Sequence, residues 1–418
     1  MAGFTLIPKH KSPQEILFIA VFLAIAAIIF LAAPQSRGLV STFDLTSQRS
    51  GVTIEAPTVV LPTDIALLLL AIMIGAVAMG QIFRHTKSVT SSILLVSGIS
   101  LFAFLVWATR DQSLNFTGML VSSLVRATPI ALAALSGIYS ERSGVVNIGI
   151  EGMMLVGAFT ATVIASAYDN MLLGVIAGML GGCLLAAIHA LLSIRYKVNQ
   201  IVSGAGLIIL ALGITSFLQR AILNVNPELN DPGPAIAAWP VPGLWELPVI
   251  GPIFFNQSPI GYVLFILIGA TFVLMNFTRW GLRIRSVGEH PKAADTLGIN
   301  VFKIRYASVL MSGAIAGLAG AYMSIGAAGR FNEGMTAGKG FLGLAAMIFG
   351  NWNPGGAFIG SIIFGFFDSW QEKLSILQVG IPVDLLGMAP YLATMIVLSG
   401  AVRRSRMPAA DGQPYEKE

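Results

Sequence analysis

The sequence is short of charge, cysteine and histidine. Only 11% of its 418 residues are Asp, Glu, Lys or Arg, whereas 55% are hydrophobic, so a water-soluble protein of this size is excluded. The single cysteine, Cys183, cannot form an intramolecular disulfide. The four histidines are scattered and indicate no metal site. The mean hydropathy of +0.80 instead predicts a polytopic membrane protein.

The net charge of +5 lies mostly in short segments between apolar runs. Lys and Arg in such segments face the cytoplasm, so this charge indicates orientation in the bilayer and gives no reason to expect nucleic acid. Lys9 and Lys11 precede the first apolar run, and Arg403, Arg404 and Arg406 follow the last one. We therefore expect both termini to be cytoplasmic, with membrane lipid around the chain.

Apolar runs recur along the whole chain. They predict an all-α fold, a polytopic bundle of about 12 membrane segments that include short broken helices: 16–33, 65–83, 89–108, 116–138, 148–168, 172–194, 201–218, 260–277, 305–326, 340–350, 355–370 and 385–401. The interval 34–64 is expected to be an extended outer loop, and 219–258 a second one rich in proline. Small residues spaced by four predict close helix packing, at Gly174, Gly178, Gly182, Gly313, Gly317, Gly356 and Gly360.

The runs divide the chain into three parts. Residues 1–115 form an amino-terminal extension with three transmembrane helices and an outer loop. Residues 116–401 form the core, and residues 402–418 form a cytoplasmic tail. The core includes a long polar interval at 279–305 with an excess of basic residues, which is typical of a cytoplasmic loop.

Two polar breaks interrupt the core at membrane depth. The first, YSERSGVVNIGIEG at 139–152, contains Asn147 and Glu151; the second, NWNPGG at 351–356, contains Asn351 and Asn353. Unwound backbone at this depth survives where it lines a cavity, so these four residues are candidates for a solute pathway. The alternative is that residues 140–147 form a simple cytoplasmic turn and Glu151 caps a helix.

The polar interval 279–305 contains a short predicted helix. Pro291 suits a first helical position and Gly298 suits the left-handed residue after a helix, so residues 291–297 are expected to form two helical turns. A solvated loop is the ordinary alternative for such a charged stretch.

The energy source for transport is not encoded in the chain. No G-x-x-x-x-G-K-[ST] motif is present, so any nucleotide would be bound by a partner. An ion-coupled secondary transporter would carry ionisable residues inside its spans, and here they are few and form no clear relay. No convergent catalytic groups or metal ligands are visible, so an enzyme is not expected.

The string GEHPKAADTLGINVFKIR at 288–305 resembles the coupling loop of ABC importer permeases, in the branch that includes ribose, branched-chain amino acid and nucleoside systems. The break SERSGVVNIGIEGMMLVGAF at 140–159 and the closing PYEKE are similar to the nucleoside and simple-sugar members. The resemblance covers about 116–418, so residues 116–401 would be the permease core, with 279–305 as its coupling loop.

This resemblance implies a permease pair, here two different chains, on two ABC ATPase subunits, fed by an extracytoplasmic substrate-binding protein. Asn147, Glu151, Asn351 and Asn353 would line the passage. The ATPase contact would be formed by Gly288, Glu289, Pro291, Ala294 and Gly298. The expected function is nucleoside import across the cell membrane, with no cofactor in this chain; the alternatives are a simple-sugar permease and, from another class, an ion-coupled secondary transporter.

Overall fold

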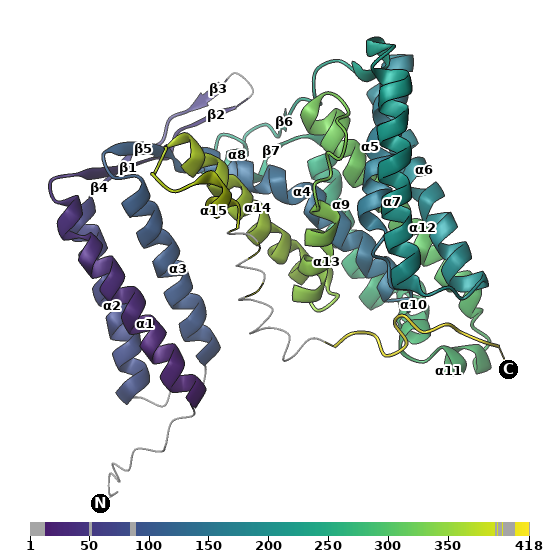
Figure 1. The fold of residues 1–418 in the computed structure, drawn as a ribbon, viewed down its shortest axis with the longest axis horizontal. Helices are drawn as coiled ribbons and strands as arrows, with labels where there is room; N and C mark the ends of the chain where they lie inside the picture. The colour runs from purple at the N-terminus through teal and green to yellow at the C-terminus, as the bar shows by residue number, and fades with distance from the viewer. Residues whose placement is uncertain are drawn as a thin grey trace, which may run out of the picture. The chain divides into compact units, whose positions relative to one another are not determined.

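The computed structural model describes residues 13–49, 52–83, 89–388, 391, 395 and 406–417, and most of them are helical (Figure 1). Within these residues, nine helices are long and apolar enough to cross a membrane, and α13 is a shorter apolar helix. A polytopic helical bundle is therefore confirmed. The predicted count of twelve is not established. The last predicted segment begins in α15 (Val383–Gly387) and lies largely outside the described residues.

Two compact units make up the chain. The amino-terminal unit contains Met1–Ser47, Glu55–Thr117 and Glu372–Val383, and the core unit contains Gln48–Ile54, Gly118–Gln371 and Asp384–Glu418.

In the amino-terminal unit, three apolar helices lie side by side (Figure 1): α1 (Pro13–Ala32), α2 (Thr63–Phe83) and α3 (Val89–Ala108). Their shared interior is small and apolar, and it consists of Phe22, Ala26, Ile74, Ala78, Val96 and Ile99. Most of their remaining large side chains are exposed in the isolated chain, as lipid-facing helices require.

A small sheet occupies part of the expected loop at 34–64, so the fold is not purely helical. Strand β1 (Val40–Asp44) pairs antiparallel with β4 (Val59–Pro62) and parallel with β5 (Gln112–Asn115). A second pair joins β2 (Ser47–Arg49) to β3 (Val52–Ile54). A 3₁₀ turn, η1 (Pro34–Ser36), precedes β1. The expectation of an extended loop was wrong here, because the strands are short and β5 lies far along the sequence.

The core unit contains the remaining helices. Its long elements are α4 (Phe116–Glu141), α5 (Ile150–Tyr168), α6 (Met171–Ala190), α7 (Gln200–Leu218), α9 (Pro259–Phe277), α12 (Val301–Ala321) and α14 (Pro354–Ile376). Shorter helices are α8 (Ile250–Phe254), α10 (Arg279–Glu289), α11 (Pro291–Thr296) and α13 (Lys339–Phe349). Three π-helical segments extend α6, α7 and α12, namely η2 (Leu191–Arg195), η3 (Gln219–Leu223) and η5 (Tyr322–Ala328). The 219–258 interval holds a 3₁₀ turn, η4 (Pro227–Asn230), and β6 (Trp239–Pro240), which pairs with β7 (Asn256–Gln257).

Close helix packing at the spaced glycines is confirmed. A Cβ atom on Gly317 of α12 would lie 2.1 Å from the carbonyl oxygen of Gly178 in α6, and one on Gly182 would lie 2.3 Å from the carbonyl oxygen of Gly313. Only hydrogen fits at these positions, so the backbones of α6 and α12 touch directly.

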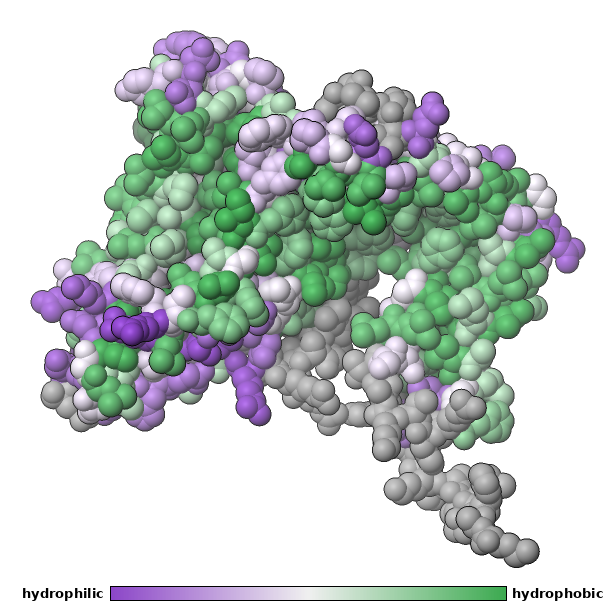
Figure 2. Space-filling model, turned by 180° about the vertical axis from the view of Figure 1, so that it is seen from behind, coloured by the Kyte–Doolittle hydropathy of each residue, from purple (hydrophilic) through white to green (hydrophobic). Residues whose placement is uncertain are grey.

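The surface of the core unit matches a membrane protein. Figure 2 shows an apolar band between two hydrophilic ends of this unit. One of these ends carries residues 141–147, α10, α11, the turn 350–353 and residues 406–417, and we refer to it as the basic end.

Candidate functional site

The first polar break folds as a buried turn between α4 and α5. Asn147 is fully buried, and its Nδ2 donates to Ser312 Oγ of α12 at 3.0 Å. Ser312 Oγ is in turn 2.8 Å from Ser136 Oγ of α4. These three side chains form a polar ladder across α4, the turn and α12. The Oδ1 atom of Asn147 is buried without a hydrogen-bond partner, which leaves one strong acceptor available.

Glu151 lies at the start of α5, but it caps a different helix. Its Oε1 accepts from the backbone N–H of Gly338 at 2.8 Å and its Oε2 from that of Gly340 at 2.6 Å. These N–H groups belong to the first turn of α13, which has no intrahelical partners for them. The carboxylate also opposes the positive end of the α13 dipole. Glu151 therefore fixes where the short helix begins.

The second break is a tight turn between α13 and α14. Asn351 and Trp352 both have φ of 54°, a left-handed conformation that ends α13. Asn353 Oδ1 accepts from the N–H of Gly355 at 3.0 Å and so caps α14. Asn351 Oδ1 accepts from the N–H of Arg406 at 2.7 Å.

The four candidate pathway residues therefore do not meet in one place. Glu151 binds the beginning of α13, whereas Asn351 and Asn353 follow its end, about 16 Å away for an 11-residue helix. Asn147 joins α12 instead. Glu151, Asn351 and Asn353 lie at the two ends of α13 and at the start of α14.

The turn 350–353 and the end of α4 are bound to each other. Trp352 Nε1 donates to Glu141 Oε2 at 2.7 Å, and Arg142 Nε donates to the Trp352 carbonyl at 3.2 Å. The two polar breaks thus meet through Glu141 and Arg142.

The predicted short helix in 279–305 is present as α11. His290 Nδ1 accepts from the N–H of Ala293 at 3.1 Å at its start, and Gly298 has φ of +81° at its end. The Gly298 N–H donates to the Asp295 carbonyl at 2.8 Å. Ala294 is buried, whereas Leu297 is 82% exposed.

A second helix in this interval, α10, was not expected. Its signal was present in the sequence: Gly281, Ile284, Val287 and Gly288 recur every three or four residues and are the buried positions. Thr278 Oγ1 accepts from the Gly281 N–H at 3.1 Å and caps it. Gly288 packs so closely that a Cβ there would lie 2.2 Å from the Arg142 carbonyl oxygen.

The carboxyl-terminal residues 406–417 pack against these elements at the basic end (Figure 1). The Ala410 N–H donates to the Gly288 carbonyl at 2.8 Å, and the Ala409 N–H donates to Glu289 Oε2 at 3.3 Å. Arg305 Nη1 donates to the Gln413 carbonyl at 2.9 Å. A surface hollow between this segment and α11 is lined by residues that include Glu289, Pro291 and Tyr415.

Asp411 is the buried acid of this segment. Burial raises the pKa of Asp411 from 3.8 to about 7, although the nearby charge of Arg305 acts in the opposite direction. Sequence reasoning gave this residue no role, because a short polar tail carries no pattern that predicts docking.

Comparison with known proteins assigns a family. Residues 119–399 match the family described as "Branched-chain amino acid transport system / permease component". The chain is 41% identical to the guanosine ABC transporter permease protein NupQ of Bacillus subtilis, over 71% of this chain and 95% of NupQ.

Two further relatives cover similar lengths. The nucleoside ABC transporter permease protein NupC of Lactococcus lactis is 40% identical over 72% of this chain and 96% of NupC. The putative glucose ABC transporter permease protein TsgC13 of Haloferax volcanii is 34% identical over 72% of this chain and 98% of its own length. No solved structure matches the chain significantly.

Proposed function

Because the chain belongs to the ABC transporter permease family of branched-chain amino acid type, we propose that it translocates nucleosides as a subunit of an ATP-driven importer. It is a multi-pass protein of the cell membrane and a transport component rather than an enzyme. The observation that carries the nucleoside assignment is the 40–41% identity to two nucleoside-type permeases over nearly their whole lengths.

The partners follow from this assignment. ATP hydrolysis belongs to an ABC ATPase subunit at the basic end, so this end is cytoplasmic. Solute arrives from a substrate-binding protein on the opposite side, and a second, different permease chain completes the passage.

At the basic end, the ATPase contact is formed by α11 and the residues around it. Glu289, Pro291 and Gly298 are at least partly exposed there, and Gly288 and Ala294 are buried behind them and support the contact. The support is local geometry. The helix is short and capped at both ends, and its last turn presents Leu297 to solvent. A large apolar side chain that is 82% exposed on a polar helix suits a protein interface.

Asn147 is assigned to the passage because its buried Oδ1 has no hydrogen-bond partner and is a free acceptor beside α12. Glu151, Asn351 and Asn353 act on the passage through α13, because they fix its two ends and the start of α14.

A simple-sugar permease is the second candidate, favoured by the 34% identity to TsgC13. ATP hydrolysis by the reconstituted complex with its binding protein separates the two. Stimulation by guanosine and uridine but not by glucose or ribose supports the nucleoside assignment, whereas stimulation by a sugar alone overturns it.

The coupling role of α11 is tested with Leu297→Ser. We expect uptake to fall at least ~10-fold and the ATPase to be lost from purified complexes, because Leu297 makes the apolar contact with the partner. The control is Leu247→Ser, which removes an exposed leucine in the 219–258 interval. Normal ATPase retention in Leu297→Ser would contradict the coupling assignment.

A further inference from the structure

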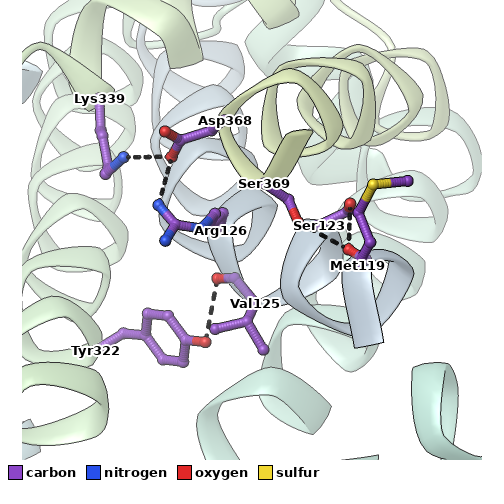
Figure 3. A network of polar contacts seen from close by, with 8 residues as sticks. All are labelled: Met119, Ser123, Val125, Arg126, Tyr322, Lys339, Asp368 and Ser369. Atoms are coloured by element: carbon purple, nitrogen blue, oxygen red, sulfur yellow. Dashed lines mark hydrogen bonds and ion pairs between the residues drawn. The ribbon is translucent and has the colours of Figure 1, made fainter. Parts of the chain in front are cut away.

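Three charged side chains from three helices of the core unit meet in one place, and none of the three was assigned a role above (Figure 3). Asp368 of α14 lies between Arg126 of α4 and Lys339 at the start of α13. Its Oδ2 is 3.3 Å from Arg126 Nη1 and 3.1 Å from Lys339 Nζ. We call Arg126, Lys339 and Asp368 the charged triad.

The triad lies at membrane depth. Arg126 is roughly 20 Å along α4 from Glu141, and Asp368 is roughly 20 Å along α14 from Pro354, at 1.5 Å per residue. Glu141 belongs to the basic end and Pro354 directly follows its turn 350–353, so the triad lies well inside the apolar band of the core unit.

The triad is also partly open. The exposed fractions of the side chains of Arg126, Asp368 and Lys339 are 31%, 25% and 22%. Charged groups at this depth face a water-filled path or a protein partner, because exposure to lipid costs several kcal/mol. The open sides of these residues are therefore expected to face water or a protein partner rather than lipid.

The backbone beside each triad residue is held in place. Pro129 inside α4 cannot donate to the carbonyl of Val125, and Tyr322 Oη donates to this carbonyl instead, at 3.2 Å. Ser369 Oγ donates to the Met119 carbonyl at 2.9 Å. Gly338 and Gly340, on either side of Lys339, are bound by Glu151. These bonds preorganise the positions from which the three charged side chains extend.

The chemistry of the triad suits a solute rich in hydroxyl groups. A guanidinium and an ammonium donate hydrogen bonds, and a carboxylate accepts them, so together they complement vicinal hydroxyls, which do both. The charges of the triad already neutralise each other in part. A neutral solute therefore replaces hydrogen bonds within the triad by hydrogen bonds between the triad and its own hydroxyl groups. Weak binding of this kind allows release, as a transport path requires.

We propose that Arg126, Lys339 and Asp368 contact the sugar hydroxyls of the transported solute during passage. This assignment rests on the proposed import function. The competing explanation is a purely structural ion pair that ties α4, α13 and α14 together.

The test compares guanosine with 2′,3′-dideoxyguanosine in uptake by the reconstituted complex, using the same binding protein throughout. In Asp368→Asn we expect the concentration for half-maximal guanosine uptake to rise at least ~10-fold. We also expect the preference for guanosine over its dideoxy analogue to fall several-fold relative to wild type. Complex assembly and the maximal rate should stay near wild type. Arg220→Gln, which breaks an exposed ion pair with Glu333, is the control and should change none of these values.

A charge exchange separates the two explanations. Arg126→Asp combined with Asp368→Arg keeps opposite charges on α4 and α14 but moves the acceptor to another helix. Restoration of wild-type uptake by this exchange would show a structural ion pair and overturn the proposal, as would failed assembly or an unchanged solute preference in Asp368→Asn.

The proposed function is tested by the wild-type complex alone. If that complex imports a sugar and no nucleoside, the nucleoside assignment fails. The charged triad is then tested in the same variants with glucose and 2-deoxyglucose. If Asp368→Asn keeps the wild-type preference for glucose over 2-deoxyglucose, the proposed role of the triad is overturned independently.

Discussion

The amino-terminal helices and the central core helices are all long and apolar enough to cross a membrane, but they bury very different fractions of their residues. In the most apolar stretch of each span, 11%, 22% and 28% of residues are buried in α1, α2 and α3, against 72%, 67% and 83% in α4, α5 and α12. The first three helices are rich in large aliphatic residues, whereas α12 contains many Gly, Ala and Ser residues. In this chain, the three amino-terminal spans are thus more apolar and less buried than α4, α5 and α12.

The physical reason for this difference in burial is that the helices are surrounded by lipid rather than water. Lipid is as apolar as leucine, so burying large aliphatic side chains between helices gains little. Small residues allow close backbone contact, and buried hydroxyl and amide groups find partners only inside the protein. The core helices hold the glycine contacts and the polar ladder for this reason.

The largest expected effect breaks the close packing. Gly317→Leu should abolish stable assembly of the core, because even a Cβ at this position would lie 2.1 Å from the Gly178 carbonyl oxygen. Gly98→Leu in α3 should be nearly neutral, since a Cβ there meets nothing within 4 Å. Size-exclusion profiles of both variants in detergent check this contrast, and similar profiles would remove the distinction between the two regions.

A smaller effect is expected for the polar ladder. Ser312→Ala removes the hydroxyl that pairs with Asn147 and leaves its amide poorly satisfied, which should cost about 1–3 kcal/mol of stability. Ser100→Ala in α3 removes only a bond to the Val96 carbonyl of the same helix and should cost less. Thermal unfolding of the two variants measures the difference, and an equal loss would refute the comparison.

The most local effect concerns pH at the basic end. Because burial raises the pKa of Asp411 from 3.8 to about 7, the docked tail holds a proton more tightly than the free tail. Docking should weaken as the pH rises from about 4 to about 7. Hydrogen exchange at the Ala410 amide, corrected for its intrinsic pH dependence, reports docking.

In the amino-terminal unit, the Thr63 amide, which donates to the Leu39 carbonyl, is the control and should show no such trend. Asp411→Asn should abolish the trend at Ala410. If the trend persists in this variant, another group controls docking.

Local sequence signals predicted local structure well. The apolar runs predicted the long helices. Pro354 and its flanking glycines predicted the break before α14, and Pro291 with Gly298 predicted α11 and its ends. The close approach of α6 and α12 also followed, because glycine spacing encodes it directly.

Pairings between distant segments could not be predicted in this way. Strand β5 joins β1 across some 70 residues, and the tail docks on α10 without any pattern of its own. Asp368 and Arg126 are isolated charges in the sequence, and their spacing does not reveal that Lys339 joins them. The contact between these residues depends on how α4, α13 and α14 pack together, which cannot be predicted from the spacing of residues in one sequence.

The cap on α13 has a consequence for the order in which the protein is made. Glu151 and its partner amides at Gly338 and Gly340 are separated by 187 and 189 residues. At 5–20 residues per second, synthesis leaves roughly 10–40 s between them. During this time α5 carries an acid at its end that has no final partner, and such a group favours contact with water over lipid. The hydrogen bonds that fix the start of α13 therefore form only after residues 338–340 have emerged from the ribosome.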